Sequence, residues 1–312
     1  MNPKDIQFLL NHGFFSELDI HFADLMTRLS VKADEDVFLA ASLVSRATGE
    51  GHVCLDLSTV EGRPLITDES RADGFVCPGL GAWRKKLDSS RVVGRPGDYK
   101  PLILDDRSRL YLYRYWEYEN ILANKMGERV ASKIEGVDVP LLKNGLSTFF
   151  SPLKNGQTDW QKLAAFVSVL KRFCVISGGP GTGKSTLIAK IIALILKQRE
   201  DNGTRIAIAA PTGKAAARLQ EAIQNGKETL PVEEAVKEAM PTEASTIHRL
   251  LGTIPGSPYF RHNIQNPLPV DMVIVDEASM ADLALMSKLV QALPSDARLI
   301  LLGDKDQPGI RV

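Results

Sequence analysis

The sequence predicts an α/β protein: a parallel sheet with helices on both faces, preceded by a smaller, mainly helical N-terminal domain. Three observations predict this. In the second half of the chain, four short apolar runs alternate with helical stretches. A glycine-rich turn follows the first of these runs, and helical periodicity dominates the beginning of the chain. A length of 312 residues agrees with two domains.

The amino-terminal third is expected to hold helices and a few short strands. Helical spacing of apolar residues leads up to Gly13, and 34–49 predicts one helix with acids in its first turn and a glycine at its end. Alternating apolar residues predict a strand over 52–58, and 101–115 predicts two strands joined by a turn. Nothing here has the spacing of an active site, so a packing or partner-binding role is expected.

Proline and glycine are frequent between 136 and 158, which places the domain boundary there and the domains at 1–135 and 145–312. The buried strands expected after it are 173–178, 206–211, 273–277 and 299–304, with helices over 184–197 and 212–224. Strands that are apolar on both faces and alternate with helices indicate a parallel sheet covered on both sides.

Composition restricts the class of protein. With 44% hydrophobic and 24% charged residues the chain is typical of a globular protein, and no apolar run is long enough to span a membrane. The N-terminus lacks the pattern of a secretory signal. Three widely spaced cysteines argue against a disulfide framework or a zinc site. A cytoplasmic location without membrane association is therefore expected, and a net charge of zero neither requires nor excludes nucleic acid.

The run from Gly178 to Ser185 fits G-x-x-x-x-G-K-[ST] between a strand and a helix. Glycines let backbone N–H groups converge on phosphate oxygens, and the following helix points its positive end at the same anion. Lys184 can reach the β and γ phosphates, and the Ser185 hydroxyl can bind Mg²⁺. The predicted nucleotide-binding residues of this P-loop are Gly178, Gly179, Pro180, Gly181, Thr182, Gly183, Lys184, Ser185 and Thr186.

Three further sets of polar side chains flank the P-loop or follow other strands. Asp276 and Glu277 close a strand, where an Asp can hold Mg²⁺ and a Glu can deprotonate water, unless the pair only caps a helix. Gln307 follows the last strand and can sense the γ-phosphate, unless it belongs to a simple turn. Gln161 precedes the P-loop and can pair with adenine, unless it only faces solvent.

Six runs together resemble superfamily 1 DNA helicases and, more closely, the exodeoxyribonuclease V alpha subunits of the RecD type. In chain order they are the segment around Gln161, VISGGPGTGKST, AAPTGKAAARL, STIHRLLG, VIVDEASM and LLGDKDQ. The runs GEGHVCLDLS and RLYLYRYW also look like the N-terminal domain of that family. The likeness therefore spans nearly the whole chain.

The resemblance implies that the P-loop domain is RecA-like and that the chain is an ATP-dependent 5′–3′ DNA helicase subunit of double-strand break repair and recombination. It implies ATP and Mg²⁺ as cofactors, single- and double-stranded DNA ends as substrate, and beta and gamma subunits as partners in a heterotrimer. The roles carried over are catalysis for Lys184, Glu277 and Gln307, Mg²⁺ binding for Ser185 and Asp276, and adenine binding for Gln161. The DNA-contact candidates are Pro211, Thr212, Lys214, Thr246 and His248, unless the polar ones only cap helices or are satisfied polar groups of the core. The turn-rich segment 252–269 is a candidate for the small hairpin with which relatives part the strands.

The sequence departs from the family at its end, five residues after Gln307. Family members continue into a second RecA-like domain, whose arginine finger is worth about 10³–10⁵ in rate, and Arg311 has no motif context to replace it. A truncated form is therefore expected. Two other functions stay open, an ATP-binding assembly module without motor activity and a stand-alone 5′–3′ helicase, while STIHRLLG and GDKDQ argue against a clamp loader.

Overall fold

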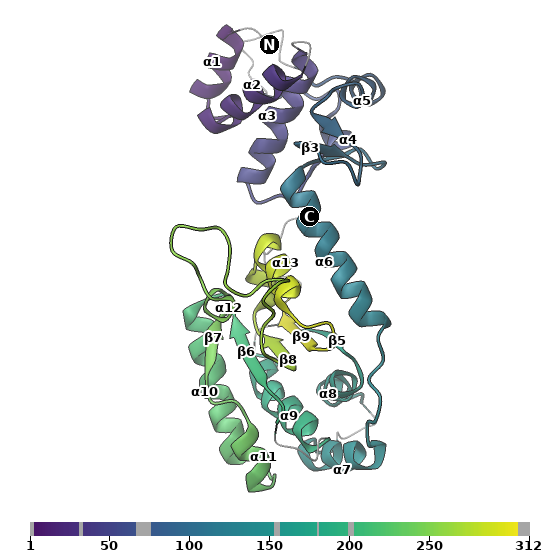
Figure 1. Ribbon diagram of the computed structural model, residues 1–312, viewed down its shortest axis with the longest axis vertical. Coiled ribbons are helices and arrows are strands. Elements are labelled where there is room, and N and C mark those ends of the chain that lie inside the picture. The colour runs from purple at the N-terminus through teal and green to yellow at the C-terminus, as the bar shows by residue number, and fades with distance from the viewer. Residues whose placement is uncertain are drawn as a thin grey trace. The chain divides into compact units, whose positions relative to one another are not determined.

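The computed structural model describes residues 3–30, 34–66, 76–152, 157–179, 181–198 and 203–304. They form two compact units, and the chain passes from one to the other between Glu119 and Asn120, inside helix α6 (Tyr113–Ala131). Each unit has a sheet and a hydrophobic core of its own (Figure 1).

The first unit packs helices against a small sheet whose strand order is β1-β4-β3-β2. Its strands are β1 (Leu55–Asp56), β2 (Val93–Gly94), β3 (Leu102–Leu104) and β4 (Arg109–Leu112). Its helices are α1 (Pro3–Asn11), α2 (Glu17–Leu29), α3 (Glu35–Gly49), α4 (Leu57–Val60) and α5 (Leu80–Asp88). Helix α3 begins where Asp34 accepts a hydrogen bond from the Asp36 amide at 2.9 Å, which confirms the helix predicted over 34–49.

Two predicted strands of this unit end earlier than the sequence pattern indicates. The predicted strand over 52–58 is reduced to β1, because Asp56 accepts a hydrogen bond from the Ser58 amide at 2.9 Å and starts α4. Strand β4 ends at Leu112, and the aromatic residues that follow it belong to α6. At the end of β1, a helix cap overrides the alternating pattern that predicted a longer strand.

The sheet of the second unit has the strand order β5-β9-β8-β6-β7, and every neighbouring pair is parallel. Its strands are β5 (Phe173–Ser177), β6 (Ile206–Ala210), β7 (Ala244–Thr246), β8 (Met272–Val275) and β9 (Arg298–Gly303). Four of them are the predicted strands. The fifth, β7, lies at the edge of the sheet and is only partly buried, so it lacks the apolar run by which the others are recognised.

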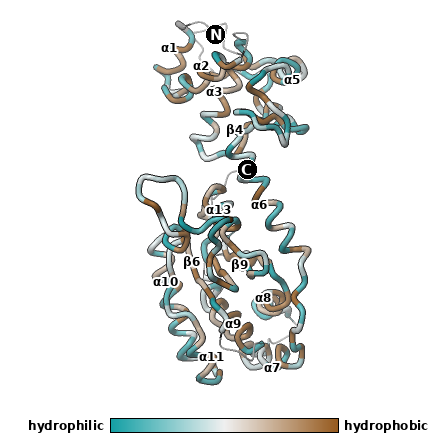
Figure 2. Tube along the Cα trace, in the orientation of Figure 1, coloured by the Kyte–Doolittle hydropathy of each residue, from teal (hydrophilic) through white to brown (hydrophobic). Residues whose placement is uncertain are grey.

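Helices cover this sheet on both faces, as predicted (Figure 1). One core contains residues of α7 (Val139–Phe149), α8 (Trp160–Leu170), α9 (Lys184–Lys197), α10 (Gly213–Thr229) and α11 (Glu234–Ala239). The other contains residues of α12 (Ile247–Leu251), α13 (Leu283–Ala292) and the second half of α6. The central strands are hydrophobic along their length (Figure 2), because both of their faces are buried.

The segment 136–158, where the sequence places the domain boundary, contributes α7 to the core of the second unit. Pro140 lies in the first turn of α7, where a proline is tolerated. Gly145 lies against α9, since a Cβ there would come within 2.6 Å of Leu194 Cδ2. The proline and glycine that indicate a linker therefore start a helix and allow close helix packing, and the units divide within α6 instead.

Candidate functional site

The P-loop joins β5 to α9 at the edge of the sheet where the strands end. Gly181 and Gly183 have φ values of +75° and +78°, in the left-handed region that glycine adopts without steric cost. Gly183 is the N-cap of the 14-residue helix α9, which begins at Lys184. The N–H groups at a helix N-terminus attract anions, so the backbone here is suited to phosphate. Pro180 lies outside the described residues.

Side chains of the P-loop and of α8 hold the loop together. The Lys184 ammonium donates to the carbonyl oxygens of Gly178 and Gly179, the latter at 2.9 Å. Gln161 Nε2 donates to the Thr182 carbonyl at 2.8 Å, so this amide contacts the P-loop directly. Adenine recognition by Gln161 stays a prediction.

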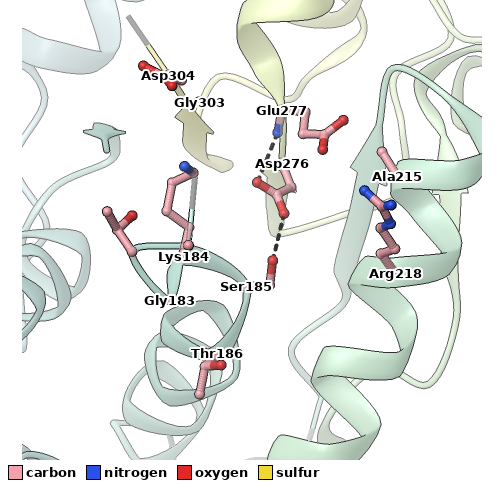
Figure 3. Close-up of a pocket in the computed structure, with 12 residues that line it drawn as sticks. Gly183, Lys184, Ser185, Thr186, Ala215, Arg218, Asp276, Glu277, Gly303 and Asp304 are labelled. Carbon is pink, nitrogen blue, oxygen red and sulfur yellow. Dashed lines mark hydrogen bonds between the residues drawn. The ribbon is translucent and has the colours of Figure 1, made fainter. Parts of the chain in front are cut away.

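Ser185 and Asp276 come together from α9 and from the residue after β8. Ser185 Oγ donates to Asp276 Oδ2 at 3.2 Å (Figure 3). Asp276 is only 7% exposed, and its other oxygen accepts the Glu277 amide at 2.9 Å. A hydroxyl and a carboxylate oxygen at one point suit Mg²⁺, which takes its remaining ligands from water and substrate phosphates. The residues present therefore fit the magnesium site expected from the sequence.

Ser185 and Asp276 are the candidate metal centre because their oxygens meet at one point. Among the described residues there is no group of three His, Cys, Asp or Glu side chains suited to a metal. A cation bound here relies on Ser185, Asp276 and oxygens of the ligand. Within the same ranges, no helix has the length and apolar character needed to cross a bilayer.

Glu277 has an unusual backbone conformation, with φ at +52°. Its amide is bound by Asp276, and its carbonyl accepts the Met280 amide at 3.0 Å, which closes a short 3₁₀ turn over Ala278–Met280. The carboxylate of Glu277 lines the same cavity as Lys184 and Asp276 (Figure 3).

The cavity has a volume of about 510 Å³, within the usual range for small-molecule sites. The predicted site residues that line it are Gly181, Thr182, Gly183, Lys184, Ser185, Thr186, Asp276 and Glu277. Arg218 and Asp304 also line it; both lie in the runs AAPTGKAAARL and LLGDKDQ, but the sequence analysis gave neither of them a role of its own. Asp304 follows β9 as Asp276 follows β8, so strand-end position is a signal that could have found it. Arg218 lies three residues after Ala215 on α10, and only the packing of α10 shows that this face meets the cavity.

Gln307 and Arg311 lie outside the described residues, so γ-phosphate sensing by Gln307 stays a prediction. Strand β9, which precedes Gln307 in the chain, ends beside the P-loop. The Gly178 amide donates to the Gly303 carbonyl at 3.1 Å, and a Cβ at Gly303 would come within 3.2 Å of Ser279 Oγ. The end of β9 therefore lies close to both the P-loop and the turn that carries Glu277.

The DNA-contact candidates lie together at the ends of β6 and β7. These strands pair in parallel with Ala210 opposite Thr246. Thr212 Oγ1 accepts a hydrogen bond from the Ala215 amide at 3.2 Å, so Thr212 is the N-cap of α10. Thr246 caps α12 in the same way, through the Arg249 amide at 3.1 Å. The candidates are Pro211, Thr212, Lys214, Thr246 and His248, and none of them is among the described residues that line the cavity.

The segment 252–269 forms a short hairpin-like loop after α12. An antiparallel bridge joins Thr253 to Phe260, and Lys288 of α13 donates to the Pro258 carbonyl at 2.7 Å. Tyr259, next to Pro258, is 72% exposed. These two contacts hold the loop in place, and the side chain of Tyr259 is exposed to solvent.

Two family models match the chain. The N-terminal domain of RecBCD enzyme subunit RecD matches residues 11–111, and an AAA domain matches residues 161–310. A solved structure of UvsW from phage T4 is similar with a TM-score of 0.42 at 15% identity, covering 69% of this chain and 44% of that one.

Three curated relatives show how the likeness is distributed. The RecBCD enzyme subunit RecD of Mycolicibacterium smegmatis is 38% identical, over 93% of this chain and 49% of the relative. That of Mycobacterium tuberculosis is 37% identical, over 95% of this chain and 48% of the relative. The ATP-dependent RecD2 DNA helicase of Deinococcus radiodurans is 44% identical, over 44% of this chain and 16% of the relative. The chain spans about half the length of the RecD relatives it matches. With the RecD N-terminal domain, the AAA domain and this identity along nearly all of its length, the chain belongs to the RecD family.

Proposed function

We propose that this chain is the ATP-binding portion of a RecD-type DNA helicase subunit, which uses ATP hydrolysis to move along DNA. The observation that carries the proposal is the contact between Ser185 and Asp276, with Glu277 on the same cavity. A P-loop hydroxyl, a strand-end aspartate and an adjacent carboxylate are the groups that phosphoryl transfer to water requires.

The described side chains have distinct parts in this chemistry. Lys184 and the N-terminus of α9 bind the β and γ phosphates, and Lys184 exchanges its bonds to Gly178 and Gly179 for phosphate oxygens. Ser185 and Asp276 hold Mg²⁺, which when bound neutralises phosphate charge and orients the phosphates. Glu277 orients a water molecule and takes its proton on a carboxylate oxygen.

The proposed DNA site is the edge of the sheet at the ends of β6 and β7. The 17-residue helix α10 begins there, beside the end of β7 in the parallel register of Ala210 and Thr246, and the N-terminus of such a helix binds phosphates. Lys214 and His248 add side chains able to contact a phosphodiester. The loop 252–269 is proposed to part the strands of a duplex with its exposed Tyr259.

The match of 11–111 to the RecD N-terminal domain supports a subunit of a RecBCD-type complex over a stand-alone helicase. The RecD2 relative matches a smaller share of the chain. We therefore assign to the first unit the contact with the beta and gamma subunits. Movement in the 5′–3′ direction and a role at DNA ends in double-strand break repair belong to the same proposal.

The test is binding of a fluorescent, non-hydrolysable ATP analogue with Mg²⁺, followed by ATP turnover with and without single-stranded DNA. Lys184→Ala should weaken binding by more than about 100-fold, because it removes a charged contact to two phosphates. Lys227→Ala, at the far end of α10, is the matched control. Equal affinity of Lys184→Ala and the unaltered chain would contradict the proposed site. Turnover stimulated by DNA would support the motor, and binding without turnover would favour the assembly-module function.

A further inference from the structure

Arg218 lies on the cavity wall formed by α10. It lines the cavity together with Lys184, Ser185, Asp276 and Glu277. Its side chain is exposed, and it makes no hydrogen bond or ion pair with any other residue that the structure describes. The Arg218 guanidinium has five N–H donors, and a ligand bound in the cavity can accept hydrogen bonds from them.

The packing of α10 determines that Arg218 faces the cavity. Leu219 is fully buried in the core, and Gly226 lies so close to α9 that a Cβ would come within 2.4 Å of Ala189 Cβ. Gln220 Oε1 accepts the Ala244 amide of β7 at 3.2 Å. These contacts set the rotation of the helix about its axis. Arg218 is therefore presented to the cavity by a fixed helix, and its own side chain is free to reach a ligand.

Carboxyl groups outnumber cationic side chains among the described residues that line the cavity. Three carboxyl groups line it, those of Asp276, Glu277 and Asp304, and the described cations that line it are Lys184 and Arg218. Lys184 lies on the P-loop, and Arg218 lies on the other side of Asp276 (Figure 3). A polyphosphate bound at Ser185 lies between the two cations. Apart from the Mg²⁺ proposed at Ser185 and Asp276, such a ligand would face three carboxyl groups and one ammonium group if Arg218 were removed.

Successive turns of helix α10 contribute residues to two different sites, the proposed DNA edge and the cavity. Thr212 and Lys214 at its start belong to the proposed DNA edge and do not line the described part of the cavity, whereas Ala215 and Arg218 do line it. We infer that Arg218 is a nucleotide-phosphate-binding residue, presented to the cavity by the second turn of α10. This inference rests on the proposed function of the cavity.

The experiment compares Arg218→Ala, Arg218→Lys and the control Lys227→Ala in the full chain. The affinity of each for the non-hydrolysable ATP analogue with Mg²⁺ and for an oligothymidylate is measured separately. Arg218→Ala should lower the affinity for the ATP analogue by about 10- to 100-fold, which is the loss expected for one charge-assisted hydrogen bond. Arg218→Lys should restore part of it, and oligothymidylate binding should be unchanged in all three variants.

Unchanged affinity of Arg218→Ala for the ATP analogue overturns the inference, and so does a loss of oligothymidylate affinity alone, which would assign Arg218 to DNA. Circular dichroism and the urea midpoint of each variant separate misfolding from lost contact. Lys184→Ala separates a failure of the proposed nucleotide site from a failure of the role assigned to Arg218. If the unaltered chain binds the analogue and Lys184→Ala does not, a neutral result at Arg218 overturns this inference alone. If the unaltered chain does not bind the analogue, the proposed function and this inference both fail.

Discussion

The adjacent carboxylates after β8 are held in different ways. Asp276 is buried and accepts hydrogen bonds from Ser185 and Glu277, so its orientation is set. Glu277 is more exposed and has a left-handed φ of +52°. For a residue other than glycine, this conformation costs about 1–2 kcal/mol, and such strain is found where it directs a functional side chain. The backbone strain of this turn thus lies at the proposed catalytic base.

Substitution of Glu277 should separate activity from stability. Glu277→Gln keeps the side-chain shape and removes the base, so it should bind the ATP analogue normally and lose turnover. Glu277→Gly should also lose turnover, and it should be about 1 kcal/mol more stable than Glu277→Gln because glycine adopts this φ without strain. Urea unfolding and ATP turnover are the measurements. Equal stability of the two variants would show that the turn is not strained.

The cysteines agree with the sequence prediction of no disulfide framework. All three are free, and Cys77 and Cys174 are buried. Burial raises the pKa of Cys77 to about 11. Its thiol is therefore protonated at neutral pH and acts as a small core side chain, since the thiolate is the reactive form.

At the scale of elements, α9 and α10 touch through a pair of small residues. Gly226 of α10 lies against Ala189 of α9, and both are buried. Because α9 begins at the P-loop and α10 carries Arg218, the distance between these two helices sets the width of the cavity between their first turns.

Enlarging Gly226 should therefore lower the free energy of unfolding. Gly226→Ala places a Cβ within 2.4 Å of Ala189 Cβ, and overpacking of this kind costs about 1–3 kcal/mol. The matched control is Gly127→Ala in α6, where a Cβ meets nothing within 4 Å, and a gain of about 0.5–1 kcal/mol is expected from helix propensity. Urea unfolding measures both. Higher stability of both variants would show that α9 and α10 can move apart enough to accept the added methyl group.

At the scale of the whole molecule, the chain is two units with separate cores, and the described residues that line the candidate nucleotide site all belong to the second. Helix α6 passes from one to the other, and its second half is anchored by Arg129, which donates to the Pro294 carbonyl at 2.9 Å. A ligand in the cavity should thus stabilise the second unit directly.

Hydrogen exchange measures this stabilisation unit by unit. At 100 times its dissociation constant, the ATP analogue should stabilise the folded second unit by about 2.7 kcal/mol. Amides of β5, α9 and β8 should exchange more slowly with the analogue and Mg²⁺, while those of α2 and α3 should not change. Lys184→Ala is the control and should show no protection. Equal protection in both units would mean that they unfold as one.

Features that depend on a few neighbouring residues can be predicted from the amino-acid sequence alone. The P-loop needs glycines at positions of positive φ, and the caps at Asp34 and Thr212 need a side-chain oxygen two or three residues before an amide. The four apolar strands were predicted for the same reason, because burial on both faces leaves a continuous apolar run. The same local reasoning predicted too long a strand over 52–58, because the helix cap at Asp56 ends the strand there.

Which of these local features come into contact depends on how the whole chain packs. The contact between Ser185 and Asp276 joins residues 91 positions apart, and it requires the strand order β5-β9-β8-β6-β7, which no single motif encodes. The packing of α10 places Arg218 on the cavity, and the packing of α7 against α9 gives the proline- and glycine-rich segment to the second unit. Such contacts are set by the energy of the whole core, in which distant side chains fill shared space, and a local pattern carries no record of its distant partners.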